Sequence, residues 1–321
     1  MSIMTDVSPS AARRRSVPRF VWVIAAIVAL YLVAGVITPS FATFDNMLVI
    51  VRAASITGIV AIGMSYVTIS GNLFALSAAA LGAFLAVIFA LAVGHLGFAA
   101  GLAATLLVAI LAGMAQGLSI SVVGNPIITT LAFSTVFRGL AALFSGNSIV
   151  RIDSDIALAL GTGRPLGVPT QSWAFIALAL VSWALIRRAR LGRLLVLSGA
   201  NPQTAIASGL NVRLATVVAF VALSVGVAIM AVFTVSQFSQ AKADLFAGYD
   251  FDYIAAVLVG GIALRGGQGS PLQAALGAIL IALLQNFMLL NGFTAGLRMT
   301  VVGGLVLLAT GAFHLLQRRL R

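Results

Sequence analysis

Cysteine and glutamate are absent from this chain of 321 residues, and lysine occurs once, as Lys242. The absence of cysteine excludes disulfide bonds and thiolate metal sites. The two histidines, His95 and His314, are far apart in the sequence, so we expect neither a metal site nor a cofactor. A phosphate-binding loop of the G-x-x-x-x-G-K-[ST] type needs a lysine directly after its glycines, which this chain lacks. These absences argue against an enzyme.

Charged residues are also scarce, at 8% of the chain, whereas hydrophobic residues reach 61% and the mean hydropathy is +1.13. A soluble domain is usually about one quarter charged and about half apolar or less. So few charges cannot build a water-facing surface, and the composition therefore predicts a protein whose solvent is lipid. The net charge of +12 does not indicate nucleic-acid binding. The arginines collect at the edges of hydrophobic runs, where membrane orientation and anionic lipid headgroups explain them.

Long hydrophobic runs divide the chain into membrane spans, since a helix needs about 20 apolar residues to cross about 30 Å of hydrocarbon. The sequence predicts an all-α fold, a polytopic membrane helix bundle of about ten transmembrane helices. The expected spans cover residues 20–38, 53–70, 73–93, 97–123, 127–146, 172–187, 213–238, 253–264, 273–290 and 297–316. The first run is long and lacks a clear cleavage site, so we expect a retained helix rather than a cleaved signal peptide.

Three arginine clusters orient these spans, because cytoplasmic loops carry an excess of Arg and Lys. The clusters lie in an N-terminal tail (1–19), in a central loop (188–212) and in a C-terminal tail (317–321) of a membrane domain that covers 20–316. An even number of spans then places both termini in the cytoplasm, which predicts a multi-pass protein of the bacterial inner membrane. In this scheme the segments 147–171 and 240–252 face outward and hold five of the seven aspartates.

A short internal repeat raises the question of two duplicated halves. The motif Ala-Ala-Leu-Gly-Ala occurs at residues 79–83 and again at 274–278, and the same offset relates Gly71 to Gly266. Duplicated halves are common in transporters. Alanine-rich helices also repeat by chance, so both interpretations stay open.

Few polar side chains fall within the expected spans. No aspartate lies in the middle of one, which argues against a proton-coupled carrier, because the coupled proton must reside on a titratable group. Arg138 is the one charge well inside a span, and it either lines a lumen or gate or pairs with backbone carbonyls at a helix break. Gln285, Asn286 and Asn291 either hydrogen-bond across helices or line a passage.

The central loop contains the signature of a short helix. Asn201 is a suitable N-cap, Pro202 fits the first helical position, and Gly209 fits the C-terminal stop. The pattern predicts a helix of about two turns on the cytoplasmic side. A helix this short is marginal in water, so it needs a docking partner. The alternative is an ordinary amphipathic connector.

Four stretches share their order and spacing with a known family of membrane proteins. They are Gly63–Gly71, Asn125–Leu131 together with Arg138–Ala141, Leu191–Val212, and Gly248–Ser270. Together they resemble the permease subunits of ABC importers, specifically the ribose-type simple-sugar permease family. The resemblance extends from about residue 20 to the end of the chain.

The resemblance implies a transport subunit that works with cytoplasmic ABC ATPase subunits, a periplasmic substrate-binding protein and a second permease copy or paralogue. The solute that it implies is a monosaccharide. The residues that it implies for docking to the ATPase are Asn201, Pro202, Gln203, Ala205, Gly209 and Asn211. Those that it implies for the translocation path are Gly71, Asn72, Asn125, Thr129, Thr130, Arg138 and Gly266.

The chain departs from the family pattern at two places. Pro202-Gln203 stands where an acidic residue is common, and Ala75 stands where the family often has an acid before Leu76-Ser77. These departures bear on charge pairing with the ATPase and on the polar lining of the path. The sequence leaves three alternatives open: a branched-chain amino-acid permease of the same superfamily, a self-sufficient secondary carrier or channel, and a non-transporting membrane scaffold.

Overall fold

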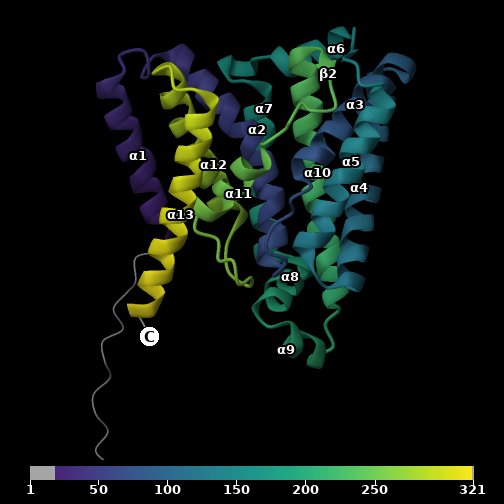
Figure 1. The fold of residues 1–321 in the computed structure, drawn as a ribbon, viewed down its shortest axis with the longest axis vertical. Helices are drawn as coiled ribbons and strands as arrows, with labels where there is room; N and C mark the ends of the chain where they lie inside the picture. Colours follow the sequence, from purple (N-terminus) through teal and green to yellow (C-terminus); the bar gives the residue numbers. More distant parts are fainter. Residues whose placement is uncertain (1–18, 320–321) are drawn as a thin grey trace, which may run out of the picture.

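The computed structural model describes residues 19–319 and is almost entirely helical in that range. Most of the helices run between two opposite ends of the molecule (Figure 1). The predicted all-α, polytopic bundle is therefore confirmed. Residues 1–18 and 320–321 of the two expected tails lie outside the described part of the chain.

Within the described residues, eight helices are long and apolar enough to cross a membrane. They are α1 (Arg19–Ile37), α2 (Phe44–Ile69), α3 (Ala78–Leu96), α4 (Phe98–Val123), α5 (Pro126–Ser145), α7 (Thr170–Arg188), α10 (Val212–Phe238) and α12 (Pro271–Leu290). A further helix, α13 (Ala295–Arg319), has a shorter apolar part, Ala295–Leu308. The span expected at 253–264 is instead the ten-residue helix α11 (Asp250–Val259), which at about 15 Å is too short to cross alone.

The connections at the two ends of the bundle differ in kind. One end carries α8 (Arg190–Ala200) and α9 (Pro202–Ala207), and α13 finishes there (Figure 1). The opposite end carries β1 (Val150–Arg151), α6 (Asp155–Thr162), the 3-10 turn Pro165–Gly167 and β2 (Gln240–Ala241). The two strands pair antiparallel, with Val150 opposite Ala241. This pairing joins the two segments that the sequence expects on the same side of the membrane, opposite the arginine-rich loop.

Helices α3 and α10 belong to the centre of the bundle, whereas α1 lies at its edge. In the apolar stretches of α3 and α10, 67% of the residues are buried, against 11% in α1. Glycines bring α4 directly against α10, because a Cβ at Gly117 would lie 2.6 Å from the Cα of Val217. Small residues that let backbones approach closely are how helices pack when lipid is as apolar as the protein.

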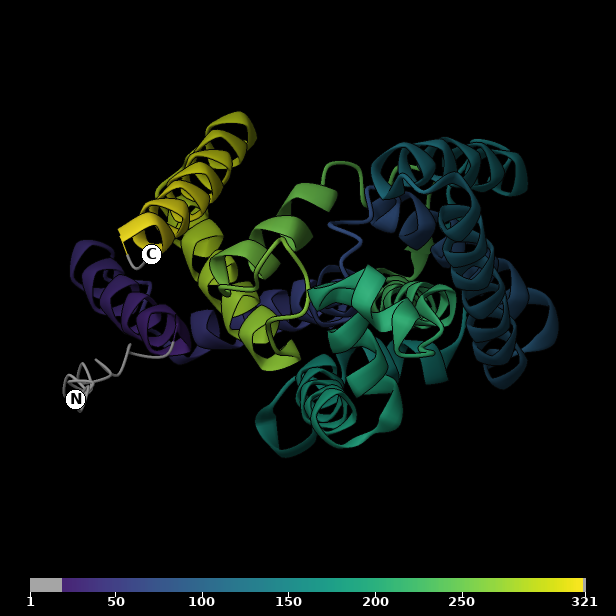
Figure 2. The ribbon, with the colours of Figure 1, turned by 90° about the horizontal axis from the view of Figure 1, so that it is seen from below.

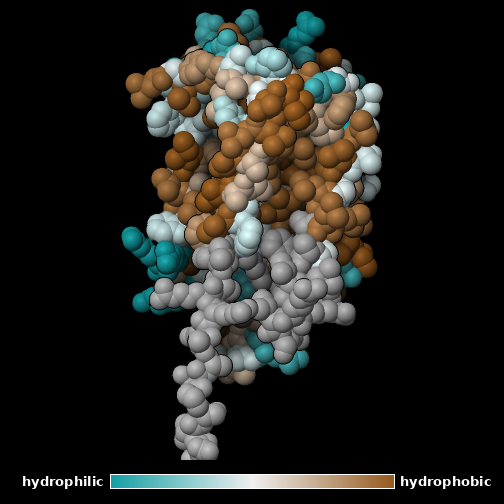
Figure 3. All heavy atoms as spheres, turned by 90° about the vertical axis from the view of Figure 1, so that its left-hand side faces the viewer, coloured by the Kyte–Doolittle hydropathy of each residue, from teal (hydrophilic) through white to brown (hydrophobic). Residues whose placement is uncertain are grey.

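The outer surface suits a lipid environment. On the face formed by α1 and α13, hydrophobic side chains make a broad band below a hydrophilic upper edge (Figure 3). Val36 of α1, for example, is 85% exposed. Seen from below, α1 and α13 lie on one side of the molecule, α4 and α5 on the other, and α11 between them (Figure 2). The chain is a multi-pass membrane protein.

Two aspartates lie inside the bundle, where the sequence places none. Asp250 and Asp252, expected in the outward segment 240–252, are in the first turn of α11, which lies about midway between the two ends (Figure 1). Asp250 is buried, and its Oδ1 accepts a hydrogen bond from the N–H of Ala79, at 2.8 Å, in the first turn of α3. A carboxylate is favourable at a helix N-terminus. The expected lack of carboxylates in the bundle is thus wrong, and it no longer argues against proton coupling.

Candidate functional site

Helix α9 forms where the sequence predicts a helix in the central loop. Oδ1 of Asn201 accepts a hydrogen bond from the N–H of Thr204 at 3.1 Å, and Pro202 occupies the first helical position. Gly209, with φ of +77°, follows the last turn in the left-handed conformation that ends many helices. The predicted caps are confirmed, although the helix covers six residues rather than two full turns.

The surface of α9 is mostly exposed at the end of the bundle. Ala205 is buried and anchors the helix, whereas Gln203 is exposed and Ile206 is 63% exposed. Asn211 caps the following helix, α10, because its Oδ1 accepts a hydrogen bond from the N–H of Leu214 at 3.0 Å. Of the six residues predicted for docking, Asn201 and Asn211 are N-caps and Gly209 follows the end of α9. Ala205 is buried, whereas Pro202 and Gln203 are exposed.

Helix α8 directly precedes α9, and it is not predicted from the sequence. Its buried side is formed by Gly192, Leu195, Ser198 and Gly199. Three of these positions, 192, 195 and 199, follow the three- and four-residue spacing of one helix face. This spacing is the sequence signal for α8, but the glycines and arginines around it obscure the helical pattern.

The end of α8 packs against two glycine breaks of the membrane domain. We use the term glycine junction for Gly71, Gly199, Gly266 and Gly267. A Cβ at Gly199 would clash with the carbonyl oxygen of Ile69, and one at Gly266 would lie 2.7 Å from the Cα of Gly71. The N–H of Gly267 donates to the carbonyl oxygen of Ile69 at 2.8 Å. Three segments far apart in the sequence therefore meet here through their backbones, and two of the predicted path glycines are in contact.

Asn72 is nearly buried beside the glycine junction. Its Nδ2 donates to Oγ of Ser70 at 2.9 Å and to Oγ1 of Thr216, near the start of α10, at 3.3 Å. The start of α10 is also the helix end that Asn211 caps from the loop side. The central loop is thus connected to the break after α2 in two ways. Gly199 of α8 contacts it directly, and Thr216 of α10 hydrogen-bonds to Asn72.

Asn125, Thr129 and Thr130 hold the start of α5. Oδ1 of Asn125 accepts a hydrogen bond from the N–H of Ile127 at 3.1 Å, and Oγ1 of Thr129 donates to the carbonyl oxygen of Asn125 at 2.9 Å. Oγ1 of the buried Thr130 accepts a hydrogen bond from the N–H of Leu76 at 3.2 Å. These contacts fix α5 to the segment between α2 and α3. A role of the three residues in the path stays a prediction.

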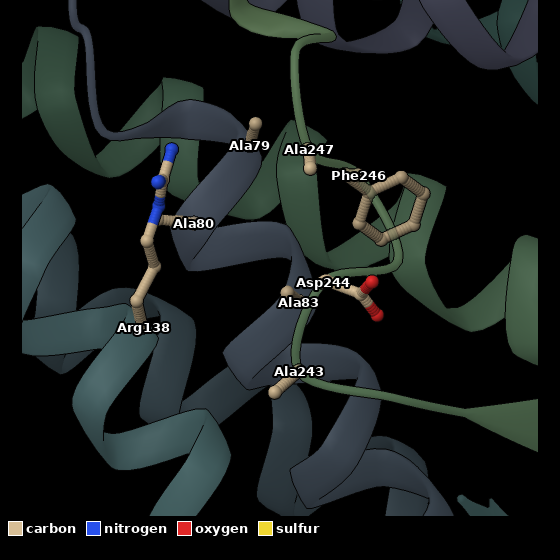
Figure 4. A pocket seen from close by; sticks show the side chains of 8 residues that line it. All are labelled: Ala79, Ala80, Ala83, Arg138, Ala243, Asp244, Phe246 and Ala247. Carbon is tan, nitrogen blue, oxygen red and sulfur yellow. The ribbon is translucent and has the colours of Figure 1, made fainter. Parts of the chain in front are cut away.

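Arg138 lies away from these residues, in the wall of a cavity of about 220 Å³. Its side chain extends past Ala80 toward Ala79 of α3 (Figure 4). The remaining wall consists of Ala83 of α3 and of Ala243, Asp244, Phe246 and Ala247, which follow β2. The carboxylate of Asp244 points away from Arg138 and pairs with Lys242 at 3.3 Å, the one ion pair among the described residues (Figure 4). Helix α5 is unbroken at Arg138, which argues against pairing with carbonyls at a helix break.

The predicted path residues therefore occupy three places: the glycine junction with Asn72, the start of α5, and the cavity beside Arg138. Among residues 19–319, no three metal-ligating side chains gather in one place. The arrangement can transmit a movement, because helix α8 at one end of the bundle contacts the interruptions of two spans.

A polytopic helical bundle with interrupted spans is an architecture that membrane permeases use. The chain belongs to the family described as the permease component of the branched-chain amino acid transport system, whose model matches residues 46–310.

Individual relatives are similar over most of the chain. The ribose import permease protein of Escherichia coli is 29% identical over 297 residues, which cover 88% of this chain and 90% of that protein. The ribose import permease protein of Bacillus subtilis is 30% identical over 292 residues, with 87% and 88% covered. The L-arabinose transport system permease protein of Escherichia coli is 30% identical over 294 residues, with 88% and 87% covered. No solved structure matches the chain significantly. The predicted resemblance to ribose-type permeases is confirmed.

Proposed function

We propose that this chain is the transmembrane subunit of an ATP-driven importer for a monosaccharide. Its relatives, which match nearly nine tenths of the chain, are named for ribose and L-arabinose. The observation that carries the mechanism is the glycine junction, where a loop helix contacts both breaks of the membrane domain. Since the chain has no lysine that fits a phosphate-binding loop, ATP hydrolysis belongs to separate ABC ATPase subunits.

The end that carries α8 and α9 is the cytoplasmic side of the inner membrane in this proposal, and both termini lie there. The positive-inside rule supports it, because five arginines surround this loop. They are Arg187, Arg188, Arg190, Arg193 and Arg213. The end with β1, β2 and α6 then receives a periplasmic substrate-binding protein. A second permease, either another copy or a paralogue, completes the passage.

The loop residues give a physical route for coupling. Asn201 is the last residue of α8's hydrogen-bonded structure, since its N–H donates to the carbonyl oxygen of Leu197, and it is also the N-cap of α9. No flexible linker therefore separates the exposed helix from Gly199. Because the glycine junction consists of backbone atoms in contact, no side chain can absorb a displacement by changing rotamer. A push on α9 moves the breaks at Gly71 and Gly266, and coupling needs such an element that both sites bias.

The direct test of this assignment is affinity purification of the tagged chain from its native membrane in a mild detergent. We expect an ABC ATPase subunit to copurify at a fixed ratio and a second permease chain to be present. If the permease purifies as a monodisperse protein without any ATPase subunit, even after gentle crosslinking, the proposal is contradicted. Uptake assays with labelled D-ribose, L-arabinose and L-leucine in the source cells separate a sugar permease from a branched-chain amino-acid permease.

A further inference from the structure

A second and larger cavity, of about 690 Å³, lies between α11, α12 and α13. It contains none of the predicted path residues. Its wall is formed by the residues around the start of α11, by Gln285 of α12, and by the first three turns of α13. This volume is within the range of about 300–1,000 Å³ that is typical of small-molecule sites.

Polar side chains from all three helices converge on this cavity. Nε2 of Gln285 donates a hydrogen bond to Oδ1 of Asp252 at 2.8 Å. Arg298 faces the same space from α13, and its buried Nε has no hydrogen-bond partner. Thr300, two residues after Arg298 in α13, donates to the carbonyl oxygen of Gly296 at 3.0 Å, which leaves its oxygen free to accept. The site thus offers both donors and acceptors.

Asp252 and Arg298 carry opposite charges but do not form an ion pair. The described residues contain a single ion pair, Lys242–Asp244, although Arg298 is near enough to act on Asp252 electrostatically. Both residues are partly buried, and charges within a membrane bundle are costly unless a partner or water satisfies them. Both groups line the same cavity, so hydroxyls of one ligand can contact either of them. Because the two charges balance, they favour a neutral ligand over an anion or a cation.

The rest of the wall is apolar and partly aromatic. Tyr249 and Phe251 line it from α11 and its approach, and Met299 lines it from α13. Phe251 is 71% exposed. A monosaccharide carries hydroxyls around its edge and C–H groups on its faces, so it needs both kinds of surface. A lipid acyl chain would fill the apolar part and leave Nε of Arg298 without a hydrogen-bond partner.

The place of the cavity fits a solute in transit. The turn between α12 and α13 lies at the end opposite α9, so the first turns of α13 belong to the half of the bundle in which we place solute entry (Figure 1). From the cavity, α11 runs toward the loop that contains Gly266 and Gly267. One short helix therefore joins this cavity to the glycine junction.

We propose that this cavity is a transient binding site for the neutral monosaccharide, with Asp252, Gln285 and Arg298 as its polar ligands. The inference rests on the proposed function. It assigns to the permease itself a low-affinity solute site on the outer half of the path.

The test uses the full chain in lipid nanodiscs free of glycolipid and of sugar-based detergent. Saturation-transfer difference NMR with D-ribose and with L-arabinose measures binding. We expect saturable binding of at least one of the two sugars, which Gln285→Leu weakens about three- to tenfold, as expected for one lost hydrogen bond. Thr300→Val weakens it as well. Thr135→Val is the matched control, because Thr135 is an exposed helical threonine on α5 whose Oγ1 donates to the carbonyl of Leu131 as Thr300 does to that of Gly296.

Unchanged binding in both Gln285→Leu and Thr300→Val, or no saturable binding by the wild type, overturns the inference. So does native mass spectrometry that shows a phospholipid held in the wild type and lost in Gln285→Leu, with no displacement by either sugar. The proposed function is scored separately, by ATP-driven uptake with the complete importer. If wild-type uptake is normal and the cavity variants bind sugar as the wild type does, the proposed site is wrong and the assignment as a permease still holds.

Discussion

At Gly209 the backbone conformation, and not the available space, excludes a side chain. Its φ is +77°, and nothing lies within 4 Å of where a Cβ would be. A β-branched residue in this conformation costs about 1–2 kcal/mol, and the C-terminal end of α9 would open to relieve it. Gly209→Val should therefore lower sugar uptake about tenfold while the protein still inserts into the membrane.

Gly94 gives the matched control for this experiment. A Cβ at Gly94 would also have nothing within 4 Å, but the φ of this residue is not in the left-handed region. Gly94→Val should leave uptake close to wild type. Equal uptake by both variants, at equal amounts in the membrane, would show that the left-handed residue after α9 has no part in coupling.

Asn201 makes a prediction about the other end of α9. Its side chain supplies the N-cap, and loss of such a cap costs about 1 kcal/mol of helix stability. If the ATPase binds the folded helix, Asn201→Ala should weaken binding of the ATPase subunit about fivefold, and Asn201→Ser should restore most of it. Titration of purified ATPase against permease in nanodiscs measures this. An Ala variant that binds as tightly as the Ser variant would refute a role for the cap.

Among the elements, α8 makes the contact that the coupling route requires. A Cβ at Gly199 would collide with the carbonyl oxygen of Ile69 and would lie 2.7 Å from the backbone nitrogen of Gly267. Overpacking of this kind costs about 1–3 kcal/mol, because backbone atoms have to shift. Gly199→Ala should lower the thermal stability of the permease. It should also uncouple ATP hydrolysis from uptake, so that ATP is consumed while little sugar is transported. Gly94→Ala should do neither. Uptake that stays proportional to ATP hydrolysis in Gly199→Ala would contradict the route.

The elements also show which parts of the fold can be predicted from the sequence. Helix α9 is predictable because its signals, Asn201, Pro202 and Gly209, are local. Helix α11 is predictable only in part: a helix is expected at 253–264, but its start at Asp250 inside the bundle is not. Asp250 is stabilised there by the N–H of Ala79, a contact across 171 positions of sequence that no local pattern reveals. A stretch with two acids therefore resembles an outward loop until the fold is known.

The candidate site is predictable only in part for the same reason. The internal repeat pairs Gly71 with Gly266, and the structure brings them together. Gly199, which completes the glycine junction, lies in a helix that is not predicted from the sequence. Three helices form the cavity with Asp252 and Arg298, so no local sequence pattern reveals it. Its one signal in the sequence is the polar Gln285 within an expected span.

For the whole molecule, sidedness is the property to establish, and the absence of cysteine makes this simple because every introduced thiol is the only one. Gln203 is exposed on α9, and Asn147 is exposed just before β1 at the other end. A membrane-impermeant maleimide should label Asn147→Cys in cells whose outer membrane alone is permeable. It should label Gln203→Cys only after the inner membrane is opened. Labelling of Gln203→Cys before that step would reverse the proposed orientation.

The central claim is that the passage has no energy source of its own and takes work from an ATPase through α9. Proteoliposomes that contain the permease, its ATPase and the binding protein should accumulate labelled sugar only when ATP is present on the α9 side. Proteoliposomes that contain the permease alone should accumulate none, whatever proton or sodium gradient is imposed. Gradient-driven accumulation by the chain without its partners would contradict the account.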